Sequence, residues 1–158
     1  MVEESNLKYW RDAGHVARRT LEAMKDELQP GKTFHEIIES AERFIHRHGG
    51  KPAFPGTIAV NDLAAHFTTN HQIEGVEGWD GDMVLQKGDC VKIDFGVHIK
   101  GHIGDNALTL EIGNSNEHTE QIKAAKEARD AAIEMLHPGP PWYKVGQAAA
   151  LPSLDAGF

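Results

Sequence analysis

The chain has 158 residues, and its 24 acidic side chains outnumber its 16 lysines and arginines, which gives a formal net charge of −8. This length suits one domain rather than two, and the charge argues against nucleic acid or an anionic membrane surface as a partner. The single cysteine, Cys90, excludes an internal disulfide framework, and without an apolar run of spanning length or a basic leader segment we expect a cytoplasmic protein with no membrane segment.

Two amphipathic helices are predicted at the start of the chain. In the first, over residues 7–28, apolar side chains recur every three or four positions until Pro30-Gly31 ends the helix. The second begins at Thr33, which forms a T-x-x-E capping box with Glu36, and ends at Gly49-Gly50. The short link between them favours an antiparallel pair of helices packed on a flat layer.

Strands are predicted in the middle of the chain. Residues 57–61 form a short apolar strand, and residues 71–82, rich in Gly, Glu and Asp, form a surface loop. Apolar and polar side chains then alternate over residues 91–96, as in a half-buried strand. Lys100-Gly101 can reverse the chain, and the apolar alternation at Leu108 and Leu110 predicts the partner strand of a hairpin.

The last clear element is a helix over residues 117–136, which a proline-rich run at residues 137–141 ends. The alanines at 148–150 favour another helix, and we expect Pro152 to break it. The residues show no internal repeat and no clean domain boundary.

The two aspartates of the hairpin are the first candidates for chemistry. A two-residue turn at Lys100-Gly101 pairs Asp94 with Ala107 and Asp105 with Gly96, which makes the carboxylates diagonal neighbours, roughly 7–8 Å apart on one face. A turn shifted by one residue pairs them directly, and a three-residue loop places them on opposite faces.

Two such carboxylates repel unless they share a proton or a cation lies between them. Hard divalent metals take oxygen ligands, and a carboxylate can bridge two of them. The alternative is a pair of unrelated surface aspartates. A glycosidase also uses two carboxylates, but it needs aromatic sugar platforms, and only 7% of this chain is aromatic.

Ten histidines offer further candidates. His66 follows a predicted strand and is either a core residue or the lining of a pocket at the end of that strand. His98 and His102 flank the predicted turn, where they are either additional metal ligands or solvated turn residues. Cys90 has no companion with metal-ligand spacing and is expected to be half-buried.

Several motifs together carry a family resemblance. The hairpin holds a long run, and an upstream segment holds Phe54-Pro55 followed by Asn61-x-x-Ala64-Ala65-His66. The hairpin run reads Asp94-Phe95-Gly96-x-His98-Ile99-x-Gly101-x-x-x-Asp105-x-Ala107-x-Thr109. This pattern resembles the methionine aminopeptidases, and the upstream part is similar to their type II, archaeal-and-eukaryotic branch. The resemblance extends from Leu7 to about Gly146.

The resemblance implies an α+β fold, one half of the pita-bread fold. In that fold two pseudo-symmetric halves form a curved antiparallel sheet, with helices on its outer face and two metal ions on its concave face. Asp94 would bind one metal, Asp105 would bridge both, and His66 would contact the substrate. The cofactors would be two divalent ions (cobalt, manganese, iron or zinc) that activate water to remove the N-terminal methionine from nascent polypeptides.

The chain departs from the family in its ligand set. The family uses five protein ligands, of which this chain matches two, and the remaining His and two Glu belong to the second half. The resemblance therefore implies that residues 1–146 are the N-terminal half of the catalytic domain and residues 147–158 a truncated or divergent tail. We expect the isolated chain to be inactive.

Three alternatives stay open at this point. The chain could be a non-catalytic pita-bread binding module, although such a module has no need of Asp94, Asp105 and His66. It could be a relative of the proline-specific aminopeptidases or creatinases, which the Ala64-Ala65-His66 segment fits less well. Two copies could also form a homodimer that imitates the two halves of the fold.

Overall fold

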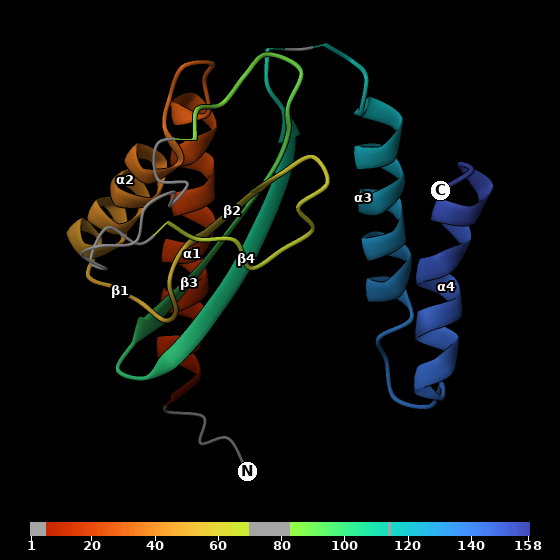
Figure 1. Ribbon diagram of the computed structural model, residues 1–158. Coiled ribbons are helices and arrows are strands. Elements are labelled where there is room, and N and C mark those ends of the chain that lie inside the picture. The colour runs from red at the N-terminus through yellow and green to blue at the C-terminus, as the bar shows by residue number, and fades with distance from the viewer. Residues whose placement is uncertain (1–5, 70–82, 114) are drawn as a thin grey trace. The chain divides into compact units, whose positions relative to one another are not determined.

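The computed structural model describes residues 6–69, 83–113 and 115–158 (Figure 1). The chain divides into two compact units, residues 1–114 and residues 115–158. The loop predicted over residues 71–82 lies outside the described residues. Among the described helices, none is long and apolar enough to cross a bilayer.

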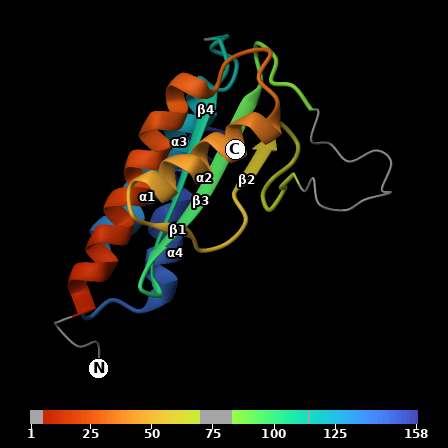
Figure 2. The same cartoon turned by 90° about the vertical axis from the view of Figure 1, so that its left-hand side faces the viewer.

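The first unit begins with the two predicted helices, α1 (Leu7–Glu27) and α2 (Phe34–Arg47). The predicted capping box starts α2, because the Thr33 N–H donates to a Glu36 carboxylate oxygen at 2.9 Å and the Glu36 N–H donates to Thr33 Oγ1 at 3.1 Å. Both helices lie on one face of the sheet (Figures 1 and 2), where α1 contacts β3 and β4 and α2 contacts β1 and β2. The predicted packing of a helix pair on a flat layer is confirmed.

The sheet has four antiparallel strands, built around β3. Strand β4 pairs with one edge of β3 along its whole length, while β1 and β2 share the other edge at different points. The strands are β1 (Lys51–Pro52), β2 (Thr57–Val60), β3 (Cys90–Ile99) and β4 (His102–Glu111). Because β1 and β2 share one edge, the residues between them leave the ladder and project beside the middle of β3.

The β3–β4 hairpin has the register that a two-residue turn predicts. Lys100 and Gly101 have φ angles of 50° and 81°, the left-handed backbone of a type I′ turn. Asp94 is therefore paired with Ala107, and Asp105 with Gly96. This register confirms the diagonal arrangement of the two aspartates and excludes both the direct pair and the opposite-face arrangement.

The core of the first unit lies between the sheet and the two helices. Alternate residues of β3 are buried on this side, and α1 crosses β4 so closely that a Cβ at Gly104 would collide with the backbone of Ala13 and Gly14. On this side the buried β3 residues are Val91, Ile93, Phe95 and Val97. Cys90, at the start of β3, is buried as well, so the expectation that it is half-buried is wrong. The opposite face of β3, which carries Asp94, is free of these helices.

The second unit is a pair of helices, α3 (Thr119–Glu134) and α4 (Trp142–Asp155). The helix predicted over residues 117–136 is confirmed. The expected break at Pro152 is wrong, because α4 continues through it to Asp155. Pro152 lies in the last turn, where the Ala156 N–H still donates to its carbonyl, so the missing proline N–H interrupts little of the helix.

The expectation of no internal repeat is also wrong. Residues 28–34 and 136–142 share the pattern Leu-x-Pro-Gly-x-x-aromatic. In each copy the glycine has a positive φ, +91° at Gly31 and +124° at Gly139, and the aromatic residue begins the second helix of a pair. The two units therefore contain one helix-turn-helix pattern twice, in the first unit capped by Thr33 and in the second preceded by Pro141.

Candidate metal centre

Asp94 and Asp105 lie on the face of the sheet opposite to α1 and α2. Asp94 alternates with the buried Ile93 and Phe95, so its side chain leaves the core side of β3. Its cross-strand neighbours are Thr57 on β2 and Ala107 on β4. Asp105 is paired with Gly96, two residues along β3 from Asp94, and therefore projects from the same face.

The surroundings of Asp94 disfavour its charged form. Burial, followed by the negative charge of Asp105 and a hydrogen bond with it, raises the pKa of Asp94 from 3.8 to about 6, and a nearby His66 partly opposes this rise. Its Oδ1 atom is buried and has no hydrogen-bond partner within the described part of the chain. A buried acceptor next to a second carboxylate is stabilised by a cation between them.

His66 reaches this face on the segment that follows β2. The Ile58 N–H donates to the carbonyl of Phe67 at 2.9 Å, and Thr68 Oγ1 donates to the carbonyl of Gly56 at 2.7 Å, so the segment folds back along β2. His66 itself has a left-handed backbone, with φ of 60°. This conformation is uncommon for a residue with a side chain and is a mark of functional segments.

A cavity of about 390 Å³ brings the three predicted residues together. It is lined by Phe54, Pro55, Thr57, His66, Thr68, Asp94 and Asp105. Sequence reasoning did not identify the two threonines as site residues. Thr57 is the direct cross-strand neighbour of Asp94, but that pairing depends on the β2–β3 register, which no pattern in the sequence indicates.

Gly96 makes room for the aromatic wall of the cavity. A Cβ at this position would collide with the ring of Phe54, so the ring lies directly against the β3 backbone. Phe54 belongs to the segment between β1 and β2, and the Ala53 N–H donates to the Gly96 carbonyl at 2.9 Å. An apolar surface therefore lies beside the two carboxylates.

The other candidate histidines do not line the cavity. His98 Nδ1 lies 3.4 Å from the N–H of Gly101, within the turn. His102 packs against Tyr9 and Trp10 of α1, with ring centroids 5.3 and 4.6 Å away. These contacts favour the interpretation of both as residues of the hairpin turn.

The side-chain atoms that could bind a metal ion at this cavity are mostly oxygens. Among the described residues, no group of three or more His, Cys, Asp and Glu side chains is arranged to hold a metal ion. Asp94 and Asp105 nevertheless fit hard divalent cations, because Asp94 Oδ1 is buried without a hydrogen-bond partner among the described residues, and because burial and the neighbouring charge of Asp105 both raise the pKa of Asp94. The described part of the chain thus offers a cation two neighbouring carboxylates at this cavity.

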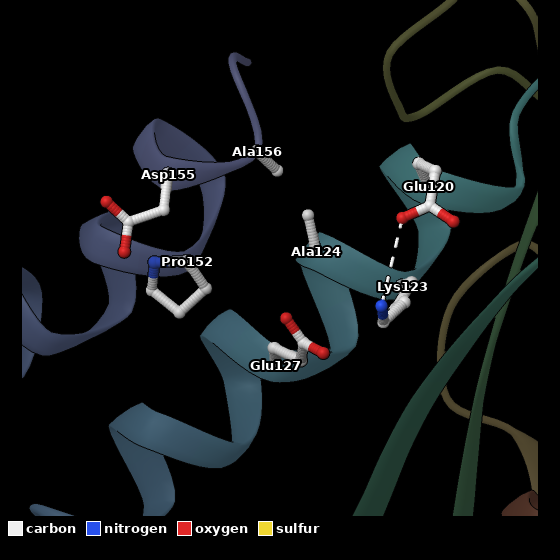
Figure 3. A pocket seen from close by; sticks show the side chains of 7 residues that line it. All are labelled: Glu120, Lys123, Ala124, Glu127, Pro152, Asp155 and Ala156. Atoms are coloured by element: carbon white, nitrogen blue, oxygen red, sulfur yellow. Dashed lines mark ion pairs between the residues drawn. The ribbon is translucent and has the colours of Figure 1, made fainter.

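A second cavity, of about 360 Å³, lies between α3 and α4 (Figure 3). Three carboxylates and one lysine surround it, and Lys123 pairs with Glu120 at 3.8 Å. These acidic side chains are exposed to water. An exposed acidic cluster of this kind lacks the desolvation that distinguishes Asp94.

The comparisons with known proteins agree with the motifs. The model of metallopeptidase family M24 matches residues 8–158. A methionine aminopeptidase of Archaeoglobus fulgidus is 35% identical over 147 residues, which is 93% of this chain and 47% of that protein. A methionine aminopeptidase of Pyrococcus horikoshii is 38% identical over 148 residues, 93% of this chain and 46% of that protein. The chain spans about half the length of the curated relatives it matches.

Solved structures share the fold. The methionine aminopeptidase of Rickettsia prowazekii matches with a TM-score of 0.84 at 24% identity, over 98% of this chain and 62% of that one. Prolidase of Pyrococcus furiosus matches with a TM-score of 0.81 at 24% identity, over 98% of this chain and 44% of that one. At these identities the likeness concerns the fold and does not separate the two activities.

Proposed function

The chain belongs to metallopeptidase family M24 and has half of its pita-bread fold, and from this membership we propose that it carries part of the catalytic site of a methionine aminopeptidase. The whole enzyme would remove the N-terminal methionine from nascent polypeptides in the cytoplasm. The observation that carries the proposal is the buried Oδ1 of Asp94, which has no hydrogen-bond partner in the described ranges and lies with Asp105 and His66 at one cavity.

In this proposal the two aspartates and the histidine have separate tasks. Asp94 and Asp105 would hold the divalent metal, and His66 would contact the peptide near the bond to be cleaved. Bound divalent ions supply Lewis acidity toward the peptide carbonyl and activate water at neutral pH; cobalt, manganese, iron and zinc all accept such ligands. Phe54 and Pro55 line the cavity with apolar surface, which suits an apolar side chain such as that of methionine.

The proposal assigns the chain only part of the site. Two carboxylates leave most of the coordination sphere of a metal open, so the chain alone would bind metal weakly. Residues 1–146, which carry both aspartates, are in this proposal the N-terminal half of the catalytic domain. Residues 147–158 are its tail, which begins inside α4.

A peptidase assay tests this function. With Co²⁺ or Mn²⁺ and a Met-Gly peptide, we expect the chain alone to show little or no turnover. Robust release of methionine that Asp105→Asn abolishes and Asp26→Asn preserves would contradict the assignment of only part of the site. Asp26 is an exposed aspartate of α1, so it matches the change in charge.

A proline-specific peptidase is the second candidate, because prolidase shares the fold. Two observations favour methionine aminopeptidase: the curated relatives at 35% and 38% identity, and the segment Asn61-x-x-Ala64-Ala65-His66. Release of the first residue from an Xaa-Pro peptide, with none from Met-Gly, would favour the second candidate instead.

Two further alternatives make different predictions. A binding module without catalysis would not need divalent metal, so it would ignore Mn²⁺. A homodimer would place two copies of Asp94 and Asp105 in a shared site, and light scattering that finds a monomer would exclude it.

A further inference from the structure

The segment that carries His66 is attached to the sheet by few contacts. Asp62, Leu63, Ala64, Ala65 and His66 are all exposed, and the Leu63 N–H donates to the Val60 carbonyl at 3.0 Å. Where the segment returns to β2, it is held by the bonds of Phe67 and Thr68 described above. The position of His66 therefore also depends on the contacts at the N-terminal end of the segment, where the chain leaves β2.

Asn61 holds that end. Its backbone is left-handed, with φ of 52°, and its N–H donates to the Cys90 carbonyl at 2.9 Å. Its side-chain Oδ1 accepts from the Cys90 N–H at 2.9 Å, and its Nδ2 donates to Asp89 Oδ1 at 3.0 Å. The Asn61 carbonyl accepts from Lys92 Nζ at 2.7 Å.

Asp89 completes this arrangement on the other side. Its second oxygen, Oδ2, accepts from the Gln86 N–H at 2.8 Å, which fixes the carboxylate in the turn before β3. With an aspartate at position 89, the side chain at position 61 must accept from the Cys90 N–H and donate to Asp89, and a carboxamide does both. An aspartate there would face Asp89 with a like charge, and an alanine would leave both groups without a partner.

The Asn61–Asp89 pair thus joins the segment that carries His66 to the beginning of the strand that carries Asp94. Cys90 and Asp94 are four residues apart on β3, about 13 Å at the usual strand rise. The pair is therefore too far along the strand to be a metal ligand itself.

We propose that Asn61, held by Asp89, is a positioning residue that keeps His66 in the candidate site beside Asp94 and Asp105. This inference rests on the proposed function for the role of His66. The connection between the segment and β3 can be measured without any metal or substrate.

Backbone ¹⁵N relaxation of the whole chain tests the proposal. In the native protein we expect order parameters of about 0.85 over residues 62–66, and in Asn61→Ala values below about 0.6. The double variant Asn61→Asp with Asp89→Asn should restore the native values, because the carboxylate and the amide exchange places and every bond of the pair can form again. Should Asn61→Ala fail to fold, Asp89→Ala, which retains the bond between Asn61 and the Cys90 N–H, should also lower these values.

The control is Thr33→Ala, which destabilises the start of α2 without touching the segment. Three results would each overturn the proposal: unchanged order parameters over residues 62–66 in Asn61→Ala, an equal decrease of these order parameters in Thr33→Ala, or order parameters that stay low in the folded double variant.

Mn²⁺ adds a readout specific to the site. Mn²⁺ should broaden the His66 ring and the Ala107 amide in the native protein, and in Asn61→Ala the broadening of the His66 ring should decrease relative to that of the Ala107 amide. Absence of broadening at both positions in the native protein would argue against the proposed metal function, while the relaxation data would still decide the role of Asn61.

Discussion

The carboxyl of Asp94 is the group whose protonation the site changes most visibly. Burial and the charge of Asp105 raise its pKa to about 6 from 3.8. An acid with a higher pKa in the folded state binds more protons when folded, so its contribution to the free energy of unfolding decreases as pH rises from 3.8 to about 6. We expect metal-free protein to lose this contribution by pH 7, and urea denaturation of the native chain and of Asp94→Asn across this range measures it.

Two comparisons separate this effect from other titrations. In Asp94→Asn the decrease between pH 3.8 and about 6 should be smaller than in the native chain. In Asp105→Asn the decrease should shrink as well, because the negative charge of Asp105, which raises the pKa of Asp94 in addition to burial, is removed. An identical pH dependence in the native chain and Asp94→Asn would contradict this account.

The residues of the candidate site differ in how far the sequence alone predicts them. The shared face of Asp94 and Asp105 follows from the turn residues, since Lys100-Gly101 can form a two-residue turn and strands alternate strictly. His66 could be identified only through the family motif, because its approach to the aspartates depends on the fold-back bonds of residues 67 and 68. Thr57 could not be identified, because its pairing with Asp94 is a tertiary register.

Among the secondary structure elements, β3 and β4 each contain a glycine that allows another part of the protein to pack closely against the strand. At Gly104 an added Cβ meets the backbone of α1, whereas at Gly96 it meets only the ring of Phe54. Backbone cannot move aside as a side chain can. We therefore expect Gly104→Ala to destabilise the protein by about 1–3 kcal/mol, and Gly96→Ala to cost less but to displace Phe54 from the cavity.

Urea denaturation of both variants measures their loss of stability, and the aromatic resonances of Phe54 report whether its ring is displaced in Gly96→Ala. Gly101→Ala serves as a third comparison: no atom of the described residues lies within 4 Å of an added Cβ, but the left-handed φ of 81° makes a side chain unfavourable. Equal stability of Gly104→Ala and the native chain would contradict the close crossing of α1 over β4.

Most elements could be predicted because local signals agree with the tertiary packing. The capping box at Thr33 and the turn at Lys100-Gly101 are examples, since each depends on residues close in sequence. A break in α4 is the wrong prediction from Pro152, because a proline so near the end of a helix interrupts few hydrogen bonds. The repeated Leu-x-Pro-Gly pattern is difficult to detect because different residues precede the second helix in the two copies, Thr33 in one and Pro141 in the other.

At the scale of the whole molecule, the candidate site combines three separate parts of the first unit. The hairpin supplies both carboxylates, the segment between β1 and β2 supplies the apolar wall, and the segment after β2 supplies His66. Sequence alone indicates the hairpin, but the other two parts meet it only because β1 and β2 share one edge of β3. This topology explains why Asp94 and Asp105 could be predicted as a pair and the cavity around them could not.

In the proposed function, Asp94 and Asp105 together bind a divalent metal. Titration of the native chain with Mn²⁺ at neutral pH, followed by electron paramagnetic resonance, measures this binding. We expect weak binding that Asp94→Asn and Asp105→Asn each abolish, while Asp26→Asn, an equal change in charge on α1, leaves it intact. Binding that survives in both site variants, or no binding by the native chain, would contradict this role of the two aspartates.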